Sequence, residues 1–517
     1  MKTYKFKLDK KLYYGDNLDV LRKYIGDESV DLCYIDPPFN SKRNYNQIYN
    51  NIGGEDRAQA QAFIDTWEWT PTTDEEFAQI VGNTNKRFTK QSINLILLLQ
   101  KVLGKGSLMA YLISMTLRIV EIYRVLKPTG SFYFHCDPTS SHYLKIIIDA
   151  IFCPQGGDYK NEISWCYKER ELSKKTWNKK HDIIFFYVKS DKYTFNYDEV
   201  REPYSDYTLE KKFKYKDEKG FYRLRYKDGR NDPVVEGENT YRQYTDKGVL
   251  ARDWWSIPIL NQAAKERLGY PTQKPETLLE KIIKASSNEG DVVLDAYCGC
   301  GTTIAVAERL GRKWIGIDIT YQSISLILKR LEEHFGIELL PFIELNGIPK
   351  DIKSAIALAN KKDDRTRKEF EKWAVLTFTN NKGIINEKKG GDGGIDGIAF
   401  IADLDTDNEQ IVKEALFSVK SDQIIPPSRI RELNGTIERE GAALGYFITL
   451  YPMNNLVRES HKYGMYNNIQ FDHTYPKIKV VSVQDILDGA RMDLPISMEV
   501  LKKAGNKYQP DQTTLEF

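Results

Sequence analysis

The stretch Val292-Val293-Leu294-Asp295-Ala296-Tyr297-Cys298-Gly299-Cys300-Gly301-Thr302-Thr303 joins an apolar run to a helical pattern that continues to Leu310. The apolar run predicts a buried strand, and the glycines permit the tight turn from which a helix starts. A second strand, at 314–317, ends at Asp318. Strands and helices also alternate outside this stretch, for example at 30–35 and 276–285. The sequence therefore predicts an α/β fold with a mostly parallel, doubly wound sheet.

The same stretch has the layout of a site for an adenosine-containing cofactor. Glycines let the backbone approach a ligand closely, and the first turn of the following helix offers free N–H groups. Asp318 ends the next strand, where a carboxylate can bind ribose hydroxyls. The loop lacks the Gly-Lys-Ser/Thr of a P-loop, which disfavours ATP. An ordinary strand–helix turn is the alternative interpretation of the glycines alone.

Asp36-Pro37-Pro38-Phe39 follows another apolar run, at 30–35. Proline cannot continue a central strand, so the strand must end here. The Asp36 carboxylate and the Pro37 carbonyl are two acceptors that can take both hydrogens of an exocyclic amine. Phe39 can stack on a base. Taken alone, the four residues also fit a strand-ending turn with an incidental carboxylate.

The two motifs together, in this order, resemble the β-type S-adenosylmethionine-dependent DNA amino-methyltransferases. That type carries the amine motif before the cofactor motif, with a target-recognition region between them. The resemblance covers about residues 10–335. Four further segments are similar to family segments: Gly15-Asp16-Asn17-Leu18, Thr272-Gln273-Lys274-Pro275, Leu126-Lys127-Pro128-Thr129-Gly130 and His135-Cys136-Asp137-Pro138.

The resemblance implies a Rossmann-like methyltransferase sheet and two sets of site residues. Those expected to bind S-adenosylmethionine are Asp16, Lys274, Asp295, Tyr297, Gly299, Gly301, Thr302 and Asp318. Those expected to hold the target amine are Asp36, Pro37 and Phe39. Tyr297 stands where the family usually has Phe, and the ring is kept. Asp36 resembles the adenine enzymes, whereas cytosine enzymes more often carry Ser, so we expect methylation of the 6-amino group of adenine, with N4 of cytosine as the alternative. A base inside a duplex must flip out to reach such a site.

Between the two motifs, about residues 155–262, lies the region that we interpret as the target-recognition insertion. From about 189 to 255 it shows little apolar periodicity and mixes cations with aromatic rings, as in Tyr222-Arg223-Leu224-Arg225-Tyr226-Lys227 and Tyr241-Arg242-Gln243-Tyr244. Cations can contact phosphates, and rings can support unstacked bases. The region predicts binding of double-stranded DNA; a solvated surface is the alternative.

A second α/β pattern follows residue 368. Gly391-Asp392-Gly393-Gly394-Ile395-Asp396-Gly397 precedes one strand, and Ser418-Val419-Lys420 lies on the next. An Asp and a Lys on neighbouring strands can converge on a divalent ion and a phosphate, and Glu371 on the preceding helix can add a carboxylate. Taken singly, each of these residues is better interpreted as a surface charge.

The combined pattern, over about residues 365–492, resembles the Mrr-like restriction endonuclease catalytic domain of the PD-(D/E)xK fold. The resemblance implies a Mg²⁺-dependent nuclease, with Asp396 and Glu371 as metal ligands and Ser418 and Lys420 in the catalytic set. Ser418 stands where the family usually has Gln or an acid, and a hydroxyl is a weaker metal ligand.

The sequence thus predicts a methyltransferase domain (1–345), a linker (346–368) and an endonuclease domain (369–517) in one restriction–modification chain. Two alternatives are a methyltransferase whose C-terminal domain binds DNA without cutting it, and a modification-dependent effector in which cutting dominates. A single nuclease site needs two copies for a double-strand break, so a homodimer is a further expectation.

Composition narrows the class of protein. The 517 residues carry 75 Lys and Arg against 73 Asp and Glu, a net charge of +2 that argues against a polybasic protein. Six cysteines without a Cys-x-x-Cys pair argue against a zinc ribbon or a disulfide scaffold. No apolar run approaches the ~20 residues that span a bilayer, and the start lacks a signal peptide's apolar segment. We therefore expect a cytoplasmic protein without a membrane partner.

Overall fold

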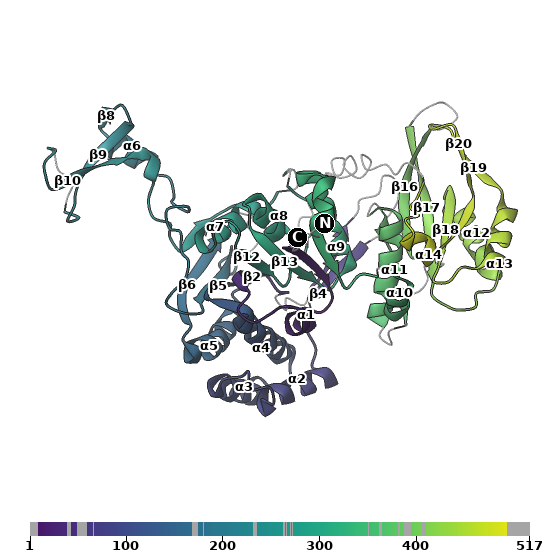
Figure 1. Cartoon of the computed structure of the whole chain (residues 1–517), viewed down its shortest axis with the longest axis horizontal. Helices are drawn as coiled ribbons and strands as arrows, with labels where there is room; N and C mark the ends of the chain where they lie inside the picture. Colours follow the sequence, from purple (N-terminus) through teal and green to yellow (C-terminus); the bar gives the residue numbers. More distant parts are fainter. Residues whose placement is uncertain are drawn as a thin grey trace, which may run out of the picture.

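The computed structural model describes most of the chain. The described residues are 9–38, 43–48, 59–65, 67–167, 174–178, 180–230, 235–261, 264, 266–268, 270, 272–349, 351–360, 364–380, 383–386, 394–404 and 410–493. Figure 1 shows a large sheet with its helices, a small sheet that projects from it, and a second α/β unit at the other end of the long axis. No helix among these residues is both long and apolar enough to span a bilayer.

The large sheet has the strand order β11-β6-β7-β5-β2-β12-β13-β1-β14. Its strands are β1 (Lys10–Tyr14), β2 (Val30–Ile35), β5 (Leu126–Cys136), β6 (Asp158–Cys166), β7 (His181–Val188), β11 (Trp254–Ser256), β12 (Val292–Asp295), β13 (Lys313–Asp318) and β14 (Ile343–Asn346). The run from β5 to β14 is parallel, whereas β7 pairs antiparallel with β5 and β6. The predicted mostly parallel sheet is confirmed.

Helices cover both faces of this sheet, as the doubly wound prediction requires. One apolar cluster joins α1 (Asn17–Tyr24), α4 (Ser107–Val125) and α5 (Ser141–Phe152) to the sheet. The other contains residues of α7 (Glu276–Ser286), α8 (Thr302–Arg309) and α9 (Tyr321–Phe335). Two further helices, α2 (Pro71–Gly82) and α3 (Lys90–Leu103), lie outside α4 and α5 (Figure 1). A short hairpin of β3 (Arg43–Ile48) and β4 (Gln59–Asp65) precedes them.

The segment predicted as an insertion, 155–262, only partly leaves the large sheet. Its strands β6, β7 and β11 extend that sheet beyond β5 because apolar residues of β7 pair with β5. The remainder forms α6 (Asp206–Lys212) and a separate sheet of β8 (Tyr215–Asp217), β9 (Gly220–Tyr226) and β10 (Thr240–Tyr244). This small sheet projects away from the body (Figure 1).

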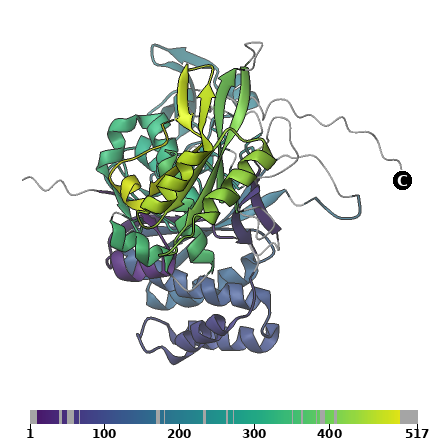
Figure 2. The ribbon, with the colours of Figure 1, turned by 90° about the vertical axis from the view of Figure 1, so that its right-hand side faces the viewer.

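The second unit contains a five-stranded sheet with the order β15-β16-β17-β18-β21. The strands are β15 (Ile384–Ile385), β16 (Gly397–Leu404), β17 (Gln410–Lys420), β18 (Leu444–Thr449) and β21 (Ile478–Ser482). Its helices are α11 (Asp364–Phe378), α12 (Ser428–Glu440), α13 (Asn454–Ser460) and α14 (Val483–Leu487). A hairpin of β19 (Met465–Asn468) and β20 (His473–Pro476) extends from it. Figure 2 shows this unit from its outer side.

The two units share one continuous apolar cluster. α9 of the large unit packs on α11 of the second, and buried residues of both belong to the same cluster. Glu369 Oε2 accepts a hydrogen bond from the backbone N–H of Tyr321 at 3.0 Å, and the Tyr321 and Thr377 hydroxyls lie 3.0 Å apart. In the segment predicted as linker, α10 (Ile352–Ala359) packs against α11, which itself begins at Asp364. The units are therefore held by a packed interface.

Candidate functional site

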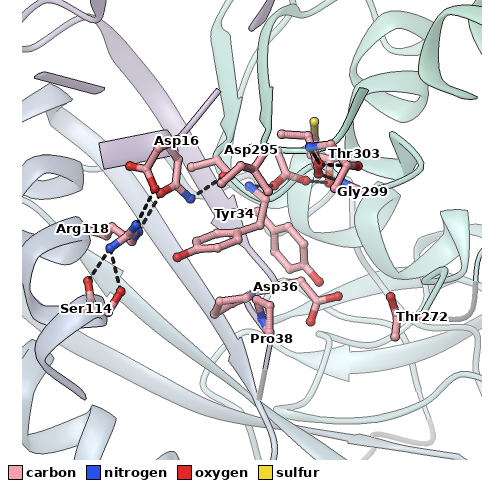
Figure 3. Close-up of a pocket in the computed structure, with 18 of the residues that line it drawn as sticks. Asp16, Tyr34, Asp36, Pro38, Ser114, Arg118, Thr272, Asp295, Gly299 and Thr303 are labelled. Atoms are coloured by element: carbon pink, nitrogen blue, oxygen red, sulfur yellow. Dashed lines mark hydrogen bonds and ion pairs between the residues drawn. The ribbon is translucent and has the colours of Figure 1, made fainter. Parts of the chain in front are cut away.

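A cavity of about 490 Å³ opens where β2, β12 and β13 end. The carboxyl ends of parallel strands meet at one edge of such a sheet, which is where α/β folds bind ligands. Seven of the eight residues predicted to bind the cofactor line it: Asp16, Lys274, Asp295, Tyr297, Gly299, Thr302 and Asp318. Asp36 and Pro37 line it as well, whereas Phe39 lies outside the described residues. Figure 3 shows Asp16, Asp36, Asp295 and Gly299 around a common space.

The glycine loop has its conformation because only glycine fits it. Gly299 and Gly301 have φ angles of 48° and 75°, in the left-handed region. A Cβ at Gly301 would lie 2.7 Å from Cγ1 of Ile327 on α9. Gly301, the predicted residue that is not part of the cavity wall, thus serves the turn that starts α8.

The Asp295 carboxylate accepts hydrogen bonds from both ends of this loop. Its Oδ1 accepts a hydrogen bond from the Tyr297 backbone at 3.0 Å, and its Oδ2 accepts one from the Thr303 hydroxyl at 2.5 Å. The pKa of Asp295 is raised to about 7, mainly by burial and in smaller part by the negative charges of Asp36 and Asp318, although these two hydrogen bonds lower it. The carboxyl group is therefore a support for the loop that also faces the cavity.

Asp318 connects the loop to β13. Its Oδ2 accepts from the Gly299 N–H at 2.9 Å, and its Oδ1 accepts from the Thr320 N–H at 2.9 Å. Burial raises its pKa to about 6, although these hydrogen bonds lower it. The Gly15 N–H donates to the Asp318 carbonyl, which brings the segment around Asp16 to the same cavity.

Asp16 caps α1 and binds an arginine that sequence reasoning missed. Its Oδ1 accepts from the Leu18 N–H, and its Oδ2 lies 2.9 Å from Nη2 of Arg118. Arg118 is buried in α4 and also donates to Asn17 and Ser114 (Figure 3). A cation inside the otherwise apolar pattern of α4 is the signal that could have found it.

At the amine site, the structure differs from the prediction for Lys274. Its Nζ lies 2.6 Å from Oδ2 of Asp36, so it pairs with the amine-site carboxylate as well as lining the cavity. The other oxygen, Asp36 Oδ1, is buried and has no hydrogen-bond partner among the described residues. A buried acceptor left without a donor is costly, so its presence needs an explanation such as a ligand.

The small sheet carries the cation–aromatic pairs that its sequence suggested. The Arg242 guanidinium lies 4.9 Å from the ring centre of Tyr222, and Lys216 lies 5.2 Å from that of Phe221. Arg242 is also paired with Asp217 and Glu236. Part of the positive charge is therefore neutralised within the sheet, while rings such as Phe221 stay exposed. Residues 168–173, 179, 231–234 and 262 of the predicted region lie outside the described residues.

In the second unit, the structure brings Asp396 and Lys420 together. Asp396 Oδ2 accepts from the Val419 N–H at 2.6 Å and lies 3.4 Å from Lys420 Nζ. Ser418 is buried and stands two residues before Lys420 on β17. Side chains two residues apart on a strand point to the same face of the sheet, so these two share a face of β17. Thr449, paired with Lys420 from β18, has a buried hydroxyl without a hydrogen-bond partner in the described part of the chain.

Glu371 is half-buried on α11, whose apolar residues pack with Phe417 and Val419. That is the face of β17 opposite to Ser418 and Lys420. Among the described residues, no three acidic, histidine or cysteine side chains are grouped as a metal site. Glu371 as a metal ligand therefore stays a prediction, and residues 391–393 lie outside the described part.

Comparison with known protein families gives two matches on this chain. Residues 30–329 match the family model described as DNA methylase. Residues 363–471 match the model described as restriction endonuclease. The first match covers more than half of the chain and contains the amine motif and the glycine loop; the second contains Asp396, Ser418 and Lys420.

Individual relatives agree with the first match. The chain is 30% identical over 218 residues to Type II methyltransferase M.HpaI of Haemophilus parainfluenzae, which covers 42% of this chain and 58% of that protein. It is 27% identical over 333 residues to DNA adenine methyltransferase YhdJ of Escherichia coli (strain K12), and the alignment covers 64% of this chain and 85% of that protein. A solved structure, the M1.HpyAVI–SAM complex, aligns with 62% of this chain and 98% of its own at 16% identity and a TM-score of 0.32.

Proposed function

The chain belongs to the DNA methylase family, and from that premise we propose that it transfers a methyl group from S-adenosylmethionine to an exocyclic amine of double-stranded DNA. The observation that carries the proposal is the buried Asp36 Oδ1, an acceptor without a donor at the wall of the cavity. An amine hydrogen of a flipped base would supply the missing donor.

The chemistry asks little of the protein beyond positioning. The lone pair of a base amine is delocalised into the ring, so the amine is a poor nucleophile. Hydrogen bonds to Asp36 Oδ1 and to the Pro37 carbonyl favour a tetrahedral nitrogen whose lone pair points at the methyl group. Holding the two reactants in line then supplies most of the rate enhancement.

The residues around the cavity fit the cofactor. Bound S-adenosylmethionine supplies an electrophilic methyl group on a positively charged sulfur. Carboxylates of Asp16, Asp295 and Asp318 give the wall negative charge that suits this cation. In this proposal Asp318 holds the ribose, and the loop with Gly299 gives the backbone close access. The cavity volume lies in the usual range for such ligands, roughly 300–1,000 Å³.

Adenine is the base that we propose. Asp36 carries a carboxylate where Ser would favour cytosine, and a charged acceptor binds an amine hydrogen more strongly than a hydroxyl does. Cytosine N4 is the alternative, and mass spectrometry of nucleosides from methylated DNA separates the two products.

Replacement of Asp36 tests the amine site. Asp36→Ala removes the acceptor for the target amine, so methyl transfer should fall by at least about 10²-fold while cofactor affinity changes little. Labelled-methyl incorporation and calorimetry with S-adenosylmethionine measure the two quantities. Asp19→Ala, on the exposed side of α1, is the matched control. Near wild-type methylation by Asp36→Ala would remove the amine site from the proposal.

For the second unit we propose Mg²⁺-dependent cleavage of DNA, in which Asp396 binds the ion and Lys420 stabilises charge on the phosphate. Their contact across neighbouring strands supports this role. Ser418, a weaker metal ligand than a carboxylate, favours the alternative of DNA binding without cutting. A methylating and a cutting unit in one chain would act as a restriction–modification enzyme, and two copies would be needed to cut both strands.

A further inference from the structure

A buried polar row continues from Asp36 into the sheet. His135 lies near the end of β5, and its side chain is completely buried. Its Nδ1 lies 2.8 Å from the Tyr34 hydroxyl and 3.7 Å from Asp36 Oδ1. Its Nε2 lies 3.3 Å from Oδ2 of Asp182 on β7. The imidazole therefore bridges two carboxylates, of which Asp36 borders the cavity.

The partners of this imidazole indicate which of its nitrogens is basic. Burial alone raises the pKa of Asp182, but the hydrogen bond and charge of His135, together with Lys274 and Tyr167, bring it below the ordinary value. Asp182 is therefore a carboxylate that accepts the proton of Nε2. Burial raises the pKa of Tyr34, so its hydroxyl is neutral and can donate to Nδ1. In the neutral ring with its proton on Nε2, Nδ1 is then the accepting nitrogen.

At 3.7 Å, His135 Nδ1 lies beside Asp36 Oδ1 but beyond hydrogen-bond distance of it. A histidine placed only to satisfy Asp36 would donate an N–H to Oδ1 at hydrogen-bond distance. Instead Nδ1 is within hydrogen-bond distance of Tyr34, and Asp36 Oδ1 keeps no hydrogen-bond partner in the described chain. His135 Nδ1 therefore lies next to Asp36 Oδ1, the acceptor at the wall of the cavity.

Methyl transfer needs such a base. The new N–C bond forms as the S–C bond breaks, so the positive charge of the sulfonium passes to the amine nitrogen, which must lose one proton. Asp36 Oδ1 is its first acceptor. The Lys274 ammonium lies 2.6 Å from the other oxygen of this carboxylate, and His135 Nδ1, 3.7 Å from Oδ1, is the next acceptor along the row.

We propose that His135, oriented by Asp182, receives the amine proton through Asp36. The inference rests on the proposed methyltransferase function. The proton moves from the methylated amine to Asp36 Oδ1 and then to His135 Nδ1, which restores the Asp36 carboxylate and leaves an imidazolium between two carboxylates. Release of the product lets the proton return through Asp36 to water. Because it acts through Asp36, His135 is a positioning residue.

This arrangement sets the direction of the pH dependence. When His135 is protonated before the reaction, Nδ1–H occupies Asp36 Oδ1 and no base remains for the amine proton. The rate should therefore rise with pH to a plateau. The charged and titratable groups that face the ring are Asp36 and Tyr34 from β2, Asp182 from β7, Tyr167 after β6, and Lys274 through Asp36.

The experiment measures single-turnover methylation of unmethylated double-stranded DNA with labelled S-adenosylmethionine from pH 5.5 to 9. His135→Gln keeps hydrogen-bonding capacity but cannot take up a proton. Its plateau rate should fall about 10²-fold, its acid limb should disappear, and its cofactor affinity should stay within about twofold. His142→Gln, an exposed histidine of α5, is the matched control and should behave as wild type.

Asp182→Asn provides a second variant in case His135→Gln folds poorly. Loss of the carboxylate that orients the ring should lower the plateau rate while the cofactor site stays intact. An unchanged plateau and acid limb in both variants overturns the inference. So does a loss of rate that merely follows a loss of cofactor binding and of melting temperature. If wild type methylates no DNA at all, the proposed function itself fails.

Discussion

At the scale of single residues, the buried carboxyl group of Asp295 makes the stability of the protein depend on pH. Its pKa, about 7, lies above the ordinary value of 3.8. Between these values the folded protein binds more protons than the unfolded chain, so stability is lost as pH rises from about 4 to 7. Asp295→Asn keeps an acceptor for the Tyr297 N–H but cannot ionise. Its unfolding free energy should therefore fall about 2–4 kcal/mol less between pH 5 and pH 8 than that of wild type. Urea denaturation at the two pH values measures this, with exposed Asp198→Asn as control. Identical pH dependence in wild type and Asp295→Asn would contradict the assignment.

At the scale of elements, the turn between β12 and α8 is packed against α9 so closely that no side chain fits. A methyl group at Gly301 would meet Ile327 and would also occupy a left-handed conformation. We expect Gly301→Ala to destabilise the protein by about 2–4 kcal/mol and to weaken cofactor binding, because the clash adds to the backbone strain. Gly290→Ala is the matched control: φ is +82°, but no atom lies within 4 Å of its Cβ, so only the strain of about 1 kcal/mol remains. Thermal melting measures the loss of stability in Gly301→Ala and in Gly290→Ala. Adding Ile327→Ala should recover part of the loss in Gly301→Ala, and no recovery would mean that packing on α9 is not the cause.

At the scale of the whole molecule, two units with separate candidate sites share one apolar interface between α9 and α11. Lys420 lies at the end of β17, outside this interface, and contacts Asp396. Lys420→Ala should therefore abolish DNA cleavage with Mg²⁺ and leave methylation within about twofold of wild type, because no partner in the large unit is disturbed. Parallel cleavage and methyl-incorporation assays on one preparation measure both, with exposed Lys462→Ala as control. Wild-type protein that cuts no DNA, methylated or not, with Mg²⁺ or Mn²⁺ would leave DNA binding as the role of the second unit.

The sequence by itself determined the elements whose signal is local. Apolar runs that stop at Pro37 or enter a glycine loop predicted β2 and β12. Motif residues such as Asp36, Asp295 and Asp318 each follow or end a predicted strand, and the family resemblance implied that they converge on one site. The two family resemblances agree with the matched regions.

Only the tertiary structure decided the contacts between segments far apart in the chain. Lys274 pairs with Asp36 across 238 positions, and His135 meets Asp182 because β5 and β7 are neighbours in the sheet. The strands of the expected insertion joined the large sheet for the same reason, since strand pairing depends on partners that periodicity does not identify. The expected linker became part of a packed interface because the apolar face of α10 needed a partner, and α11 supplied it. Local patterns fix which face of an element is apolar; the fold as a whole fixes what that face meets.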